Sequence, residues 1–175
     1  MTDRALFDAA SHGAISFHHR YHTEYLAAAW IERLMAHNCG LDALEDLLFA
    51  SVDGQRVLRP TLAPVAAWLV KSGEEPWRHR LAEWLLESAP ETHLVHGDPA
   101  ALPLDYRRRI LSNLIERYKG RSQVMLNWDR AALARLANTG LVDDLNRYLL
   151  DVAIAEDLRS DLLMVVREGK LLACV

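Results

Sequence analysis

The chain is poor in cysteine, with only Cys39 and Cys174 among its 175 residues. Two cysteines so far apart cannot supply the disulfide framework of a small secreted domain or the paired CxxC units of a zinc knuckle. Low cysteine content without a framework is typical of proteins in a reducing compartment, so we expect a cytoplasmic protein.

Long apolar runs are missing as well. The longest near-apolar run, residues 62–70, contains Pro64 and is much shorter than the roughly 20 residues of a membrane-spanning helix. The opening MTDRALFDAA lacks the apolar centre of a secretory signal peptide. We therefore expect no membrane partner.

Positive charge is neither in excess nor gathered on one face. The formal net charge is −4, and the consecutive residues Arg107, Arg108 and Arg109 would spread over about 200° of a helix. A nucleic-acid-binding surface needs basic side chains clustered on one face. We therefore expect no nucleic-acid partner.

Motifs of common catalytic and nucleotide sites are absent. The chain contains no phosphate-binding loop G-x-x-x-x-G-K-[ST], no G-x-G-x-x-G, no G-x-S-x-G and no H-E-x-x-H. We therefore expect that the chain alone is not an enzyme and binds no cofactor.

Helical periodicity dominates what is present. Apolar residues recur at helical spacing in short segments that are separated by Gly, Pro and Asn. The predicted helices span residues 20–37, 41–50, 62–71, 76–88, 104–119, 129–137, 141–150 and 156–168. The stretch SVDGQRVLRP, residues 51–60, is predicted to be a loop, and Asp98 is predicted to cap a helical turn that begins at Pro99.

This rhythm of short helices predicts a mainly α fold in which helical pairs stack as an α-solenoid or HEAT-like array. At the N-terminus, the alternation Ile15–Ser16–Phe17 and the turn residues before it predict a short β-hairpin. We expect two units, a hairpin in residues 1–19 and a helical domain in residues 20–175. The apolar ending KLLACV predicts that the helical domain is truncated at its C-terminal end.

Several side chains have an ordinary packing role in this scheme. The helix over residues 20–37 carries apolar residues around most of its circumference and is expected to be largely buried. Pairs of acids at helix starts are predicted to be solvated and to favour the helix dipole: Asp143–Asp144 and Glu156–Asp157. The tryptophans are expected to pack in the core rather than to stack on a ligand: Trp30, Trp68, Trp77, Trp84 and Trp128.

Histidines supply candidate metal ligands. His18 and His22 are four residues apart and could share a helix face beside His19, which leaves a small metal-dependent enzyme as one alternative. His93 and His96 could chelate an ion with Asp98. A metal requires further ligands in matching geometry, and a helix cap explains Asp98 better.

The residues from Phe17 to Ala28 resemble a known signature. Phe17–His18–His19–Arg20 followed by Glu24–Tyr25–Leu26–Ala27–Ala28 is similar to the pattern F-x-H-x-[ST]-x-x-E-[FY]-x-A-A of NACHT-type STAND ATPases. Tyr21 stands where that pattern has Ser or Thr. Residues 57–69, 96–111 and 134–145 resemble the HEAT-like helical region that follows the NACHT module in bacterial members.

The resemblance implies that residues 1–19 are the hairpin edge of a winged-helix domain. It implies that His19 contacts the phosphates of ADP held by a NACHT ATPase core, supplied in cis or in trans, and thereby helps to hold a closed state. Glu24 would be structural, and Ala27 and Ala28 would permit close packing. The chain would be a non-catalytic regulatory scaffold of a signalling or defence ATPase that self-associates on activation. The residues alone also leave open a stand-alone α-solenoid that binds protein partners on a concave face.

The missing phosphate-binding loop generates a first prediction. Because the chain has no recognisable nucleotide pocket of its own, ADP or ATP with magnesium should leave its melting temperature unchanged in a thermal-shift measurement. A nucleotide-dependent rise in the melting temperature would contradict this expectation.

Overall fold

A computed structural model describes residues 20–37, 39–71, 75–119 and 130–174 together with the backbone of two strands in residues 7–9 and 15–17. The described chain is mainly helical and begins with a short antiparallel hairpin, which confirms the predicted fold class. His18, His19 and Trp128 lie outside the described residues.

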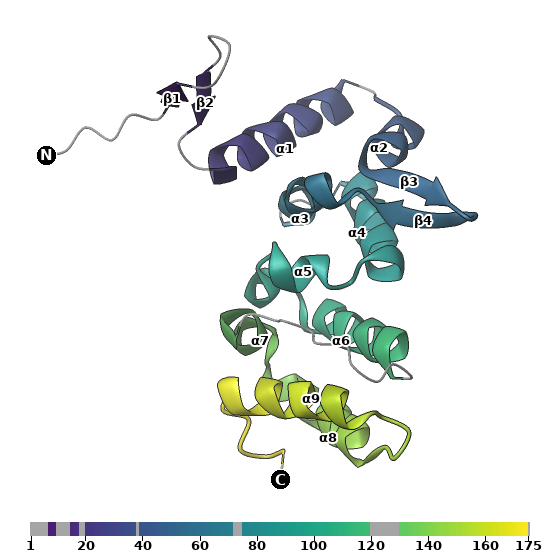
Figure 1. The fold of residues 1–175 in the computed structure, drawn as a ribbon, viewed down its shortest axis with the longest axis vertical. Helices are drawn as coiled ribbons and strands as arrows, with labels where there is room; N and C mark the ends of the chain where they lie inside the picture. Colours follow the sequence, from purple (N-terminus) through teal and green to yellow (C-terminus); the bar gives the residue numbers. More distant parts are fainter. Residues whose placement is uncertain are drawn as a thin grey trace, which may run out of the picture.

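The described elements follow one another along the chain as Figure 1 labels them, with short 3-10 helices written η. They are β1 Phe7–Ala9, β2 Ile15–Phe17, α1 Arg20–Ala36, α2 Leu41–Leu48, β3 Phe49–Val52, β4 Gln55–Leu58, η2 Pro60–Leu62, α3 Ala63–Val70, α4 Pro76–Ser88, α5 Thr92–Val95, η3 Pro99–Ala101, α6 Leu104–Tyr118, α7 Arg130–Leu136, η4 Thr139–Leu141, α8 Val142–Leu150 and α9 Glu156–Glu168.

The helices pack in two rows. One row consists of α1, α3, α5, α7 and α9, each in contact with the next, and α4 contacts α6 in the other row. Figure 1 shows α3, α5 and α7 on one side of the long axis and α4 and α6 on the other. This alternation is what stacked helical pairs produce. The assignment to the HEAT-like solenoid class stays a prediction.

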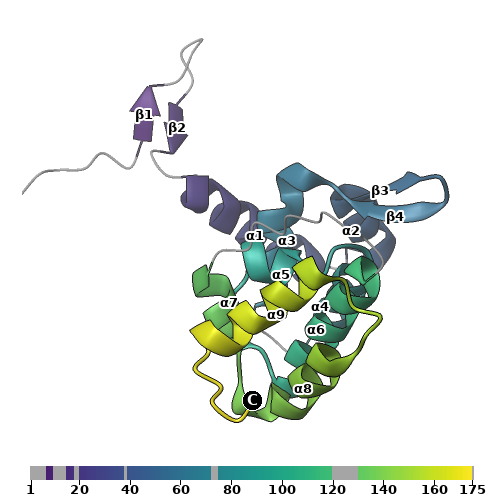
Figure 2. The ribbon, with the colours of Figure 1, turned by 60° about the horizontal axis from the view of Figure 1, so that its bottom comes forward.

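Residues 51–60 were predicted to be a loop, and this prediction is wrong because most of them form a hairpin. β3 and β4 pair antiparallel from Phe49 opposite Leu58 to Val52 opposite Gln55. Asp53 and Gly54 between them have φ values of 51° and 75°, the left-handed conformations of a tight two-residue hairpin turn. Figure 2 shows this hairpin projecting from the side of the helices.

Helix α6 joins two parts of the core. Its Ile110 and Leu114 belong to a cluster with α4, α5 and α7, whereas Leu111 and Ile115 belong to a second cluster with α8 and α9. Both pairs are spaced by four residues, so each forms a stripe along one side of the helix. A third cluster surrounds Leu69, Leu81 and Leu85 at the other end of the rows.

Helix α1 was predicted to be largely buried, and this prediction is also wrong. Only Glu24, Ala28 and Ile31 are buried, while Trp30 is 57% exposed and does not pack in the core. The reason is that α1 lies at the end of its row, where α3 covers only one of its faces. Among the other described tryptophans, Trp84 is buried, and Trp68 and Trp77 are partly buried against the core.

Arginine side chains tie neighbouring elements together. The buried guanidinium of Arg78 on α4 donates to the Leu69 carbonyl of α3 at 2.5 Å and to Glu32 of α1 at 3.0 Å. Arg56 of β4 pairs with Glu45 of α2 at 2.7 Å. Each guanidinium carries five N–H donors, so one side chain can bridge several elements.

The three consecutive arginines of α6 point to three different neighbours. Arg109 forms a two-pronged ion pair with Glu83 on α4. Arg107 donates to the Leu102 carbonyl at 2.9 Å and to the Ala100 carbonyl, which holds the loop that precedes α6. As the sequence analysis expected, the run does not form one basic stripe.

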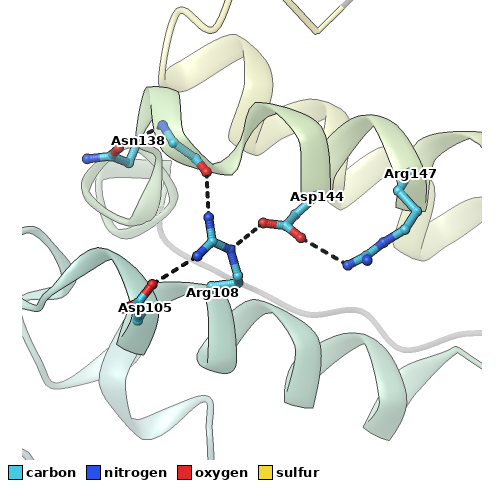
Figure 3. A network of polar contacts seen from close by, with 6 residues as sticks. Asp105, Arg108, Asn138, Asp144 and Arg147 are labelled. Carbon is cyan, nitrogen blue, oxygen red and sulfur yellow. Dashed lines mark hydrogen bonds and ion pairs between the residues drawn. The ribbon is translucent and has the colours of Figure 1, made fainter.

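Arg108 ties α6 to α8, as Figure 3 shows. Its Nε donates to Asp144 at 2.6 Å, and its other nitrogens donate to the Gly140 carbonyl at 3.0 Å and to Asp105 at 2.9 Å. Asp144 also accepts from Arg147 at 3.0 Å, and its side chain is only 13% exposed. The prediction of a solvated Asp143–Asp144 pair is therefore wrong for Asp144, although Asp143 is exposed.

Single substitutions of Asp143 and Asp144 separate the effect of the ion pairs with Arg108 and Arg147 from the effect of the helix dipole. Asp144→Ala removes the acceptor of two arginines and should lower the free energy of unfolding by about 1–3 kcal/mol. Asp143→Ala, the matched control, should lower it by at most about 1 kcal/mol through the helix dipole. Urea unfolding measures both, and equal losses would show that the Arg108 tie contributes nothing.

Candidate functional site

The junction between β2 and α1 is the place where the sequence analysis put its site residue, His19. β2 ends at Phe17 and α1 begins at Arg20, so a strand passes to a helix within the resembling stretch. Glu24 is 8% exposed and pairs with Arg20 at 2.7 Å. Ala28 is buried in the cluster that includes α3, and Ala27 packs against that cluster. Glu24 and Ala28 are therefore inward-facing residues of α1, and the family role of this stretch stays a prediction.

The predicted metal ligands do not come together where the structure describes them. Within residues 20–37, 39–71, 75–119 and 130–174, no group of three or more His, Cys, Asp or Glu side chains is arranged to hold a metal ion. His22 is exposed on α1. Asp98 accepts a hydrogen bond from the Ala100 amide at 3.3 Å. This bond caps η3, the helical turn that begins at Pro99, and confirms the predicted cap.

His93 is a buried structural residue. Its ring meets the ring of Tyr106 edge to face, with 5.3 Å between centroids. The Tyr106 hydroxyl donates to the Ala82 carbonyl at 3.0 Å, so its oxygen is left to accept from His93 Nε2 at 3.1 Å. Burial lowers the pKa of His93 to about 4 and raises the pKa of Tyr106. Both side chains are therefore neutral at pH 7 and tie α4, α5 and α6 together.

His96 lies in a groove between α3 and the segment around α5. One hollow of about 190 Å³ is lined by Ala67, Trp68, Lys71, His96, Gly97 and Asp98. A second hollow of about 230 Å³ is lined by Leu58, Pro60, Ala63, Ala89, Glu91, Thr92, Val95 and His96. His96 lines both hollows, and together we call them the α3–α5 groove.

The backbone at one end of the groove requires glycine. A Cβ atom on Gly97 would lie 2.6 Å from the carbonyl oxygen of His93, too close for any other residue without a shift of the backbone. This tight approach turns the chain from α5 into η3, where Arg107 holds the Ala100 carbonyl. The Lys71 end of the groove is therefore built on α3 and on a fixed loop.

Charge is distributed unevenly along the groove. Lys71 Nζ lies 4.9 Å from the centre of the Trp68 ring, a cation–π contact at one end. Burial lowers the pKa of His96, while Glu24 raises it and Arg20 lowers it. The first turn of α1 is thus close enough to the groove to act on it electrostatically.

The sequence analysis missed this groove, although α3 carries a signal. Ala63 and Ala67 are four residues apart and leave a narrow strip along one face of α3, bounded by Pro60 and Lys71. The lining combines apolar walls with charged ends. Such a surface is suited to binding, and we find no paired nucleophile and base among the residues that line it.

The chain matches no protein-family model, no curated protein and no solved structure. The resemblance of residues 17–28 to the NACHT signature therefore stays a prediction that rests on those residues alone. None of the described helices combines the length and the apolar character needed to cross a membrane.

The buried histidine generates a prediction about pH. The pKa of His93 is lowered from 6.5 to about 4, so between these values the unfolded chain binds a proton that the folded chain does not. Stability should be complete above pH 6.5 and fall as the pH is lowered toward 4, by roughly 2 kcal/mol at pH 5 from this group.

The measurement is urea unfolding at pH 7 and pH 5 for the natural chain and for His93→Gln. The substitution is expected to cost stability at both pH values, and it removes the titrating group. The difference between the two pH values should therefore shrink by roughly 2 kcal/mol in the variant. An unchanged difference would mean that His93 does not control this pH dependence.

Proposed function

We propose that this chain is the non-catalytic, regulatory helical scaffold of a NACHT-type STAND signalling or defence ATPase. The observation that carries the proposal is the passage from β2 to α1 within the resembling stretch, with Glu24 and Ala28 turned inward. In this proposal residues 1–19 belong to the edge of a winged-helix domain, and the protein acts in the cytoplasm.

His19 is the proposed sensor. It directly precedes Arg20, the first residue of α1, and would contact a phosphate of ADP bound by an ATPase core in cis or in trans. An imidazolium beside a phosphate forms a charge-assisted hydrogen bond, and the anion favours the charged form. Loss of this contact would release α1 from the core and bias the protein toward an open, self-associating state.

The ties of α1 support its role as a lever. It packs against α3 through Ala28 and Ile31, and its C-terminal half is joined to α4 through Glu32 and Arg78. A force on the beginning of α1 would therefore reach α3 and α4 through packed helices. The nucleotide chemistry itself would belong entirely to the core.

A second candidate function is a stand-alone helical module that binds protein partners. The α3–α5 groove favours it, because this site needs no ATPase core to be complete. The two candidates differ in whether His19 matters: it is essential to the first and irrelevant to the second.

The experiment begins with the DNA upstream of the Met1 codon, where the first proposal expects an in-frame G-x-x-x-x-G-K-[ST]. In the joined polypeptide, His19→Ala should speed ADP dissociation about tenfold, the equivalent of one charge-assisted hydrogen bond. His22→Ala, a change of an exposed histidine in the same region, is the control and should leave dissociation unchanged. Equal rates in the two variants would overturn the proposal, and an upstream region without the motif would exclude an ATPase core in cis.

A further inference from the structure

We draw no further inference here: the strongest candidate, the exposed apolar surface of helix α1 at Tyr21, Tyr25, Leu26 and Trp30, lies at the open end of its row, and nothing in the described structure shows what covers it.

Discussion

Arginine side chains that reach from one helix to the next run through the two-row arrangement and join elements that the apolar clusters bring together. Arg78 joins α4 to α1 and α3, while Arg107, Arg108 and Arg109 join α6 to its preceding loop, to α8 and to α4. Consecutive residues on a helix are about 100° apart, so the same spacing that prevents a basic stripe sends each guanidinium to a different neighbour. The groove inherits this constraint, because Arg107 holds the Ala100 carbonyl beside its Lys71 end.

The sequence predicted most helices because their apolar residues follow the helical period, and the helix at residues 156–168 begins and ends as expected. It failed where the outcome depends on neighbours that are distant in the chain. Apolar residues surround α1, but its place at the end of a row covers one face only. The side chain of Asp144 was predicted to be solvated, because its partner Arg108 is 36 residues away in the sequence. The β3–β4 hairpin was a different kind of miss, since Asp53–Gly54 is a strong local turn signal.

The candidate site was predictable only in part. The sequence identified Asp98 as a cap and singled out His96, but not the groove in which His96 lies. A groove forms between two elements, and the spacing of apolar residues within one helix does not predict how far that helix lies from its neighbour. The exposed faces at the ends of the rows differ in kind from this groove. Leu26 and Trp30 belong to an open helix face, whereas Val95 lines a hollow together with residues of β4, α3 and α5.

The first turn of α1 is where the proposed function meets the described structure. Glu24 of this turn is buried and pairs with Arg20, and His19 immediately precedes Arg20. If His19 binds a phosphate, that ligand acts on a helix that packs against α3 and is joined to α4 through Glu32 and Arg78. Thermodynamic linkage then requires that any second ligand whose affinity depends on the position of α1 and the nucleotide change each other's affinity by the same factor.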